Sequence, residues 1–271
     1  VGAMLAAGAV QLVVVACFGS LPGTASSNQD APIAVLAAVV GTLAVTGDQR
    51  SAFATIVLAI VVSTAVTGVV MLVMGRARLG RLARFVPYPV QAAFLAATGW
   101  LLLSGGLEVA AGSGLTTASL GRLDDPRFLV AATATLAVAG ALFVVTQRSD
   151  SPLALPVVVA VALGLVYVVS ALNGAGIAEL RAGGWLPAEV ARGVLWRPEV
   201  LTVLPEADVA EVIRHAGDLL TIPFLAVLGL LIGTAGVELD REVDIDADRE
   251  LQVTGTANLL TAAVGGPPGW V

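Results

Sequence analysis

Charged residues are scarce in this sequence: they make up 13% of its 271 residues, whereas 57% of the residues are hydrophobic. Soluble domains carry about 25% charged residues. A water-soluble fold of this length cannot cover its surface with so few charges, and the mean hydropathy of +0.92 agrees with that conclusion. The composition therefore excludes an ordinary soluble domain and predicts a protein embedded in a lipid bilayer.

Several reactive residue types are also nearly missing. The chain has no lysine, one histidine (His215) and one cysteine (Cys17), and Cys17 lies in an apolar run. A single cysteine excludes an internal disulfide, and the spacing of the few possible ligands offers no metal cluster. No Ser–His pair or pair of acids lies inside an apolar segment. We therefore expect neither an enzyme nor a bound metal or cofactor. A net charge of −6 also argues against a nucleic-acid partner.

Long apolar runs dominate what is present. A membrane-spanning helix needs about 20 apolar residues to cross a hydrocarbon core about 30 Å thick. In lipid such runs must be helical, because every backbone polar group needs an internal partner. The sequence predicts eight apolar helices, at residues 2–19, 31–46, 52–74, 86–110, 128–146, 153–172, 218–237 and 251–265. The third to the seventh of these are long enough to span the bilayer.

The placement of arginine predicts which loops share a side of the membrane. Residues 75–84 carry four arginines and no acid, which is typical of a cytoplasmic loop. Alternation then places 147–151 and 239–250 inside, and 47–51, 111–127 and 173–217 outside. Within the last loop, residues 208–216 predict a short amphipathic helix that contains His215. We expect a multi-pass protein of the cell's inner (plasma) membrane.

The segment 31–46 is too short to span comfortably, and polar, mostly uncharged residues precede it. Asp30 suits the cap of a helix and Pro32 suits its first turn. A short helix after a polar stretch predicts a discontinuous membrane helix whose N-terminus lies near the bilayer midplane. Such an end carries roughly half a positive charge and unpaired N–H groups, so it attracts anions.

Two interpretations of this segment stay open at the level of sequence. Residues 20–30 also fit an ordinary loop in which Asp30 only caps a helix. In the anion-binding interpretation, the Asp30 carboxylate competes for the same helix end unless it is protonated or turned away. Asp30 is then a candidate for coupling transport to protons.

Three stretches resemble the SulP (sulfate permease) family of anion transporters. Residues 18–22 (FGSLP) and 27–36 (SNQDAPIAVL) resemble the family's approach to its third membrane helix. Residues 78–94 (RLGRLARFVPYPVQAAF) resemble the start of its fifth helix, and this is the most specific match. Residues 249–267 (RELQVTGTANLLTAAVGGP) resemble its ninth helix. The three matches follow the chain in the family's order.

The resemblance implies an all-α polytopic membrane protein built as two inverted repeats of about seven segments each. This chain then holds the second to ninth segments: 1–172 in the first repeat, 173–217 as an extracytoplasmic loop, and 218–271 as the start of the second repeat. The first and tenth segments and any STAS domain are expected outside it, so the fragment alone should not transport.

The resemblance also implies a substrate site between the N-termini of half-helices three and ten. The residues of this chain that match it are Ser26, Ser27, Asn28, Gln29, Asp30 and Ala31. Thr234 on the eighth helix is a further candidate, and Glu238 shares a helix face with it. Many members carry a carboxylate midway along that helix, whereas the only acid here is Glu238 near its inner end. Asp30 and Glu238 are therefore the candidates for coupling.

These observations favour secondary transport of a small anion such as sulfate, bicarbonate or a dicarboxylate, coupled to H+ or Na+. A nucleobase transporter of the same broad fold is the nearest alternative, but it needs a midplane carboxylate to pair with base N–H groups. An anion channel is the other alternative. Homodimer formation is left open.

Overall fold

The computed structural model describes residues 2–20, 26–43, 48–85, 87–111, 126–149, 151, 153–174, 176–182, 186 and 199–270. The chain divides into two units, Val1–Thr98 with Arg192–Val271, and Gly99–Ala191. The longer helices are α1 (Gly2–Phe18), α2 (Asp30–Leu43), α3 (Gln49–Arg76), α4 (Tyr88–Ala111), α5 (Pro126–Arg148), α6 (Ala154–Leu172), α10 (Ala216–Arg241) and α11 (Ala247–Ala263). The shorter elements are β1 (Ser27–Asn28), η1 (Gly80–Phe85), α7 (Ile177–Ala182), α8 (Glu199–Thr202), η3 (Leu204–Glu206), α9 (Val209–Arg214) and β2 (Gly269–Trp270).

Each of the eight apolar segments forms one of the longer helices, as the sequence predicts. Within the described residues, three helices are long and apolar enough to cross a membrane: Gln49–Arg76, Ala154–Leu172 and Ala216–Glu238. Helix α2 has 14 residues, so it is about 21 Å long and falls short of the hydrocarbon core. Within the described residues the predicted short helix is therefore present, and its start near the bilayer midplane stays a prediction.

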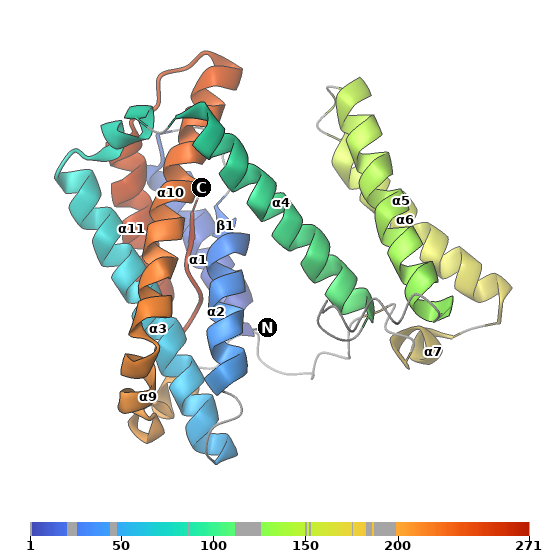
Figure 1. The fold of residues 1–271 in the computed structure, drawn as a ribbon, viewed down its shortest axis with the longest axis horizontal. Helices are drawn as coiled ribbons and strands as arrows, with labels where there is room; N and C mark the ends of the chain where they lie inside the picture. The colour runs from blue at the N-terminus through green and yellow to red at the C-terminus, as the bar shows by residue number, and fades with distance from the viewer. Residues whose placement is uncertain are drawn as a thin grey trace. The chain divides into compact units, whose positions relative to one another are not determined.

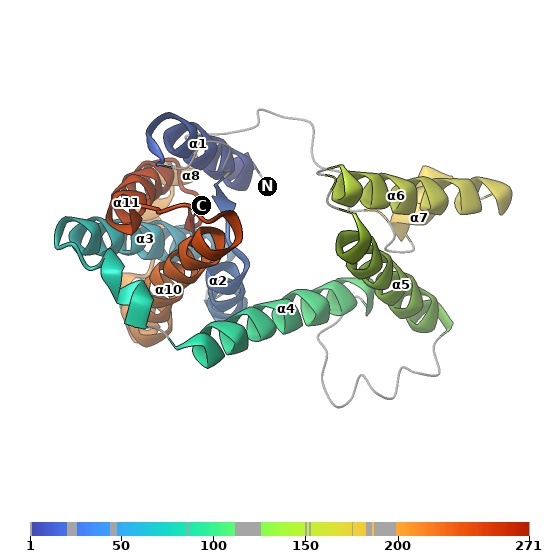
Figure 2. The same ribbon diagram turned by 90° about the horizontal axis from the view of Figure 1, so that it is seen from above.

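In the first unit, α1, α2, α3, α10 and α11 surround the two short strands (Figures 1 and 2). Two apolar clusters hold these helices together. One joins α3, α10, α11 and β2 through Met71, Leu230, Leu251 and Trp270, and the other joins α2 to α3, α9 and α10. Because α2 packs through Leu36, Val39 and Leu43, its apolar face fixes it against the full-length helices.

The seam between α3 and α11 depends on glycine. A Cβ atom placed on Gly255 would lie 2.8 Å from the carbonyl oxygen of Gly68 and 2.8 Å from the backbone nitrogen of Leu72. A Cβ on Gly68 would likewise lie 2.8 Å from the carbonyl oxygen of Gly255. The two backbones therefore touch, which only residues without a side chain permit; this is the packing that small residues give membrane helices.

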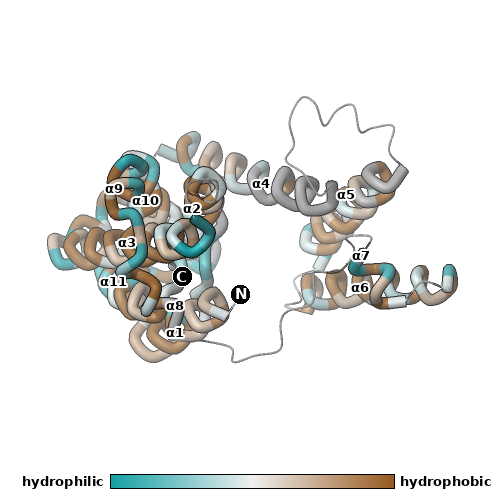
Figure 3. Tube along the Cα trace, turned by 90° about the horizontal axis from the view of Figure 1, so that it is seen from below, coloured by the Kyte–Doolittle hydropathy of each residue, from teal (hydrophilic) through white to brown (hydrophobic). Residues whose placement is uncertain are grey.

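Contacts at the helix ends agree with the predicted sides of the loops. At one end, the Gly80 N–H donates to Asp248 Oδ1 at 2.6 Å, so the arginine-rich turn lies beside the start of α11. At the other end, the Ser51 hydroxyl donates to the Glu206 carbonyl at 3.2 Å. Figure 3 shows apolar colour along the helices and polar colour at α9. We call these the inner and the outer end of the first unit, following the arginine rule.

The second unit contains α5, α6 and α7, and α5 contacts α6. None of the described side chains of α6 is buried; Leu172, for example, is 82% exposed. A helix with apolar side chains on all its faces suits a hydrocarbon environment. The division of the chain into 1–172, 173–217 and 218–271 as parts of two inverted repeats stays a prediction.

Candidate functional site

The centre of the first unit is an antiparallel pair of two-residue strands, which we call the crossover. Ser27 pairs with Trp270 and Asn28 pairs with Gly269. The Gln29 side chain adds a hydrogen bond from Nε2 to the Trp270 carbonyl at 3.2 Å. Strand β1 leads directly into α2, so this half-length helix begins inside the bundle of helices and not at its surface.

Three buried polar side chains hold the β2 segment in place. Asn258 of α11 donates from Nδ2 to the Gly269 carbonyl at 2.8 Å and accepts the Gly269 N–H at 2.9 Å. Thr64 of α3 donates to the Gly266 carbonyl at 2.9 Å. With its amide oriented to satisfy both neighbours, Gln11 of α1 donates to the Ser27 carbonyl at 3.2 Å and accepts the Gly269 N–H at 3.0 Å. Helices α1, α3 and α11 thus all fix the crossover.

The first turn of α2 differs in one respect from the prediction. Asp30 is its first helical residue and not its cap, and the carbonyl of Gln29 accepts the Ile33 N–H at 3.2 Å. Pro32 lies in the first turn, as predicted, and brings no N–H of its own. The N–H groups of Asp30 and Ala31 therefore lack intrahelical acceptors. The Asp30 side chain lies outside the part of the chain that the structure describes.

Six of the residues predicted to bind substrate, 26–31, are consecutive in the chain and lead from β1 into the first turn of α2. Ser26 is 2% exposed, and its hydroxyl has no hydrogen-bond partner. Ala31 is also buried, at 6% exposure. Ser27 is exposed, and Asn28 donates from Nδ2 to the Met4 carbonyl at 3.1 Å. This segment thus carries two backbone N–H groups without intrahelical acceptors and, on the other side of β1, one buried hydroxyl.

Thr234 and Glu238 lie elsewhere, in a polar cavity of about 420 Å³ at the inner end. Its other described lining residues are Gly80, Arg81 and residues 244–248. The Thr234 hydroxyl donates to the Leu231 carbonyl at 3.0 Å, and Glu238 Oε1 accepts the Ile245 N–H at 3.0 Å. The described lining does not include residues 26–31. The sequence spacing correctly put Thr234 and Glu238 on one face, but that face lines the inner cavity.

Helix α10 meets the crossover through Gly229. The Trp270 ring packs so closely on this residue that a Cβ atom on Gly229 would overlap it. Trp270 is 7% exposed and belongs to the core cluster of α3, α10 and α11. An aromatic ring therefore covers the face of α10 beside the crossover, and no carboxylate occurs on α10 between Asp218 and Glu238.

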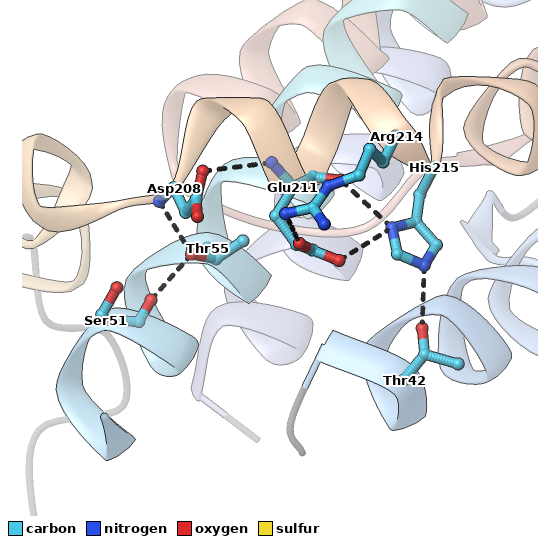
Figure 4. Close-up of polar contacts among 7 residues, drawn as sticks. All are labelled: Thr42, Ser51, Thr55, Asp208, Glu211, Arg214 and His215. Carbon is cyan, nitrogen blue, oxygen red and sulfur yellow. Dashed lines mark hydrogen bonds and ion pairs between the residues drawn. The ribbon is translucent and has the colours of Figure 1, made fainter. Parts of the chain in front are cut away.

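A second polar group joins α2, α3 and α9 at the outer end (Figure 4). His215 Nε2 lies 3.2 Å from the Thr42 hydroxyl, and His215 Nδ1 lies 3.1 Å from the Glu211 carbonyl. Glu211 also forms an ion pair with Arg214. The predicted short helix is present as α9, with Val212 buried and Ile213 exposed. His215 therefore links the last turn of α2 to the start of α10.

Asp208 caps α9, and its loss should be measurable. The Asp208 carboxylate accepts the Glu211 N–H at 3.1 Å, and its own N–H donates to the Thr55 hydroxyl at 2.9 Å. We expect Asp208→Ala to lower the free energy of unfolding by about 1 kcal/mol, the usual value of an N-cap. Thermal unfolding of the detergent-solubilised protein measures this. Thr221→Val, which removes an exposed hydroxyl on α10, is the control; equal midpoints for the two variants would contradict the assignment.

Sequence reasoning missed Gln11 and Glu250. Gln11 is the only amide side chain in α1 and is fully buried, so a lone polar residue in an apolar span was the available signal. Glu250 is also fully buried. It directly precedes the predicted apolar segment 251–265, where a solvated acid is expected, so its sequence position does not indicate burial. Among the described residues, no group of three or more His, Cys, Asp or Glu side chains is placed to hold a metal ion.

Comparisons with known proteins place this geometry in context. The family model described as the sulfate permease family matches residues 2–270. The solved transmembrane domain of a cyanobacterium bicarbonate transporter, BicA, matches with a TM-score of 0.61 and 18% sequence identity. The match covers 98% of this chain and 65% of that one, and at this identity it shows a shared fold. No curated protein shows significant similarity to the chain.

Proposed function

Because the chain belongs to the sulfate permease family, we propose that it forms part of a secondary transporter that binds a small anion at the N-terminus of α2. The observation that carries this proposal is the position of that N-terminus. Helix α2 has 14 residues and starts at a strand pair that side chains of α1, α3 and α11 hold in place. When a helix begins inside a membrane protein, the positive end of its dipole and its unpaired N–H groups face the ligand bound there.

The local chemistry favours an anion over a cation or an uncharged ligand. The helix end supplies roughly half a positive charge, and the N–H groups of Asp30 and Ala31 point toward the same end. The Ser26 hydroxyl adds a donor that is 2% exposed and has no other partner. Since hydrogen bonds to an ionised acceptor are the stronger kind, these donors suit sulfate, bicarbonate or a dicarboxylate.

The inner cavity fits a second role in the same transport cycle. Thr234 and Glu238 line it, and at about 420 Å³ it has room for a hydrated anion or a coupling cation. We assign Thr234 to the inner route of the anion, and Asp30 and Glu238 to the candidates for binding a coupling H+ or Na+. The solved relative is named a bicarbonate transporter, which adds support for bicarbonate as cargo. A plasma-membrane location and a homodimer complete the proposal.

Nucleobase transport is the rival function. It calls for a carboxylate beside the crossover that pairs with the N–H groups of a base. Helix α10 presents Gly229 there, covered by the Trp270 ring. A channel would use the same helix end but would conduct far faster than a carrier turns over, so voltage-clamp currents separate these two alternatives.

Replacing Ser26 tests the anion site. In full-length protein reconstituted into liposomes, we expect Ser26→Ala to raise KM for labelled sulfate or bicarbonate about tenfold. A hydrogen bond to a charged group contributes about 1.5–3 kcal/mol, and 1.4 kcal/mol corresponds to a factor of ten. Thr221→Val is the matched control, because it removes an exposed hydroxyl on α10 that donates only to the Gly217 carbonyl of its own helix. The same KM in both variants would remove Ser26 from the site.

A further inference from the structure

The turn that follows α3 at the inner end carries a group of exposed arginines. Residues 75–84 contain four arginines and no acid. The structure describes the side chains of three of them, Arg76, Arg78 and Arg81, and all three are exposed. None of these three side chains forms a hydrogen bond or an ion pair with a residue in the described part of the chain. The turn thus presents several positive charges without partners on the protein.

Arginine at the other end of the same helix is engaged differently. At the outer end, Arg50 of α3 forms an ion pair with Glu206 at 2.7 Å. At the inner end, Arg81 and Asp248 line the same cavity, yet the Asp248 carboxylate accepts the Gly80 N–H at 2.6 Å and forms no ion pair with Arg81. The inner arginines therefore keep their donors for a group from outside this part of the chain.

Helix α11 fixes the backbone of this turn on both sides of residues 76–78. Gln252 donates from Nε2 to the Gly75 carbonyl at 3.2 Å, and the Gly80 N–H donates to Asp248. A Cβ atom placed on Gly75 would lie 2.6 Å from the Asp248 carbonyl oxygen, so the two backbones touch. Figure 1 shows the end of α3 beside α11. The exposed arginines therefore project from a backbone that is held in place.

Arg78 has a backbone conformation that rarely suits an arginine. Helix α3 ends in a Schellman motif, in which the Leu79 N–H donates to the Met74 carbonyl at 3.0 Å and the Arg78 N–H donates to the Gly75 carbonyl at 3.2 Å. Arg78 occupies the left-handed position of this motif, with φ at 57°. Glycine is the usual residue there, because a Cβ atom crowds the backbone. The turn itself does not explain an arginine at this position, so its side chain calls for another explanation.

The exposed apolar face of α3 leads directly to these arginines. Val62, Val69, Val73 and Arg76 follow one another at intervals of seven, four and three residues, so they share one face of the helix. All four are exposed, and Val73 is 59% exposed. Helix α3 is long and apolar enough to cross a membrane, so this face meets acyl chains. Basic residues directly after such a span lie at the level of the lipid headgroups.

We propose that Arg76 and Arg78 bind the phosphate of an anionic phospholipid of the inner leaflet, whose acyl chains lie along Val69 and Val73. A guanidinium group presents a planar fork of N–H donors that matches phosphate oxygens, and its hydrogen bonds to them are charge-assisted. A zwitterionic phospholipid carries the same phosphate together with an ammonium group, which the arginines repel. The site therefore prefers a headgroup with net negative charge. It contains no residue of the anion site proposed above and does not depend on that site.

The test uses the full-length protein in micelles of a neutral detergent mixed with equal parts of phosphatidylglycerol and phosphatidylcholine. After affinity purification, mass spectrometry measures the ratio of the two lipids that the protein retains. We expect the wild type to prefer phosphatidylglycerol. The ratio should fall about fivefold in Arg76→Gln and in Arg78→Gly, the usual contribution of one basic side chain at an anionic membrane surface. Arg78→Gly should also keep or raise the thermal midpoint, since glycine suits the left-handed position, so unfolding cannot explain its loss of lipid.

Two variants and one competitor complete the test. Arg50→Gln removes the same charge at the outer end, where Arg50 pairs with Glu206, and should leave the ratio unchanged. Arg76→Lys keeps the charge and should keep most of the preference. Inorganic phosphate should displace no more phosphatidylglycerol than sodium chloride does at equal ionic strength; stronger displacement would indicate a site for the free ion and overturn the proposal. Equal retention of the two lipids by the wild type, or an unchanged ratio in Arg78→Gly, would overturn it as well.

Discussion

Gly255→Ala is expected to separate α3 from α11 and to destabilise the protein by about 3 kcal/mol, at the upper end of the usual cost of overpacking. The new methyl group would lie 2.8 Å from both the Gly68 carbonyl oxygen and the Leu72 nitrogen. Both are backbone atoms, so no side chain can rotate away and a whole helix must shift. The thermal midpoint of the detergent-solubilised protein, followed by tryptophan fluorescence, measures the loss.

Gly236→Ala is the matched control for this prediction. Gly236 lies on α10, and nothing surrounds the position of its added Cβ within 4 Å. Glycine-to-alanine exchange in a helix without a clash is stabilising by up to about 1 kcal/mol. Midpoints that rise in both variants would show that the backbones of α3 and α11 are not in contact.

Asn258→Leu is expected to open the crossover. The substitution removes the acceptor and the donor that bind the Gly269 backbone at 2.9 and 2.8 Å. The buried Gly269 carbonyl then loses its Asn258 partner, which costs about 1–3 kcal/mol. The Gly269 N–H loses Asn258 as well but can still donate to Gln11. Hydrogen exchange should accelerate in peptides covering 264–270, and sulfate or bicarbonate uptake by the full-length protein should fall at least tenfold.

The neighbouring hydroxyl on α11 provides a control for Asn258→Leu. Thr256 is exposed and donates only to the Gln252 carbonyl of its own helix, at 2.8 Å. Thr256→Val should leave exchange at 264–270 and anion uptake unchanged. Slow exchange at these residues in Asn258→Leu would mean that the strand pair is held by something other than Asn258.

The helices of this protein were predictable because lipid permits so few alternatives. An apolar run such as 52–74 has to be a helix, and the arginines of 75–84 indicate its inner end. The short length of α2 followed from the apolar run 31–46, and its start followed from Pro32 and the polar residues before it. These inferences use local patterns, and the contacts at both ends of the first unit agree with them.

The crossover itself was not predictable from local patterns. Its strands have two residues each, which is too short for any periodic signal, and they pair residues far apart in the chain. For the same reason the position of the Trp270 ring over Gly229 was not predictable. Glu250 and Gln11 were missed because their burial depends on α1 lying beside α11 and the crossover, which sequence spacing alone does not reveal.

The distance along the chain between the two strands has a consequence for biosynthesis. Gln29 and Trp270 are separated by 241 residues, so a ribosome adding about 5–20 residues per second needs roughly 10–50 s between them. During that interval α2 enters the membrane with the backbone of β1 still lacking its partner strand. Water in the insertion machinery, or a chaperone, has to satisfy those groups meanwhile. Nascent chains halted before Gly269 should therefore be more sensitive to protease and quality control near residues 26–31 than the finished protein.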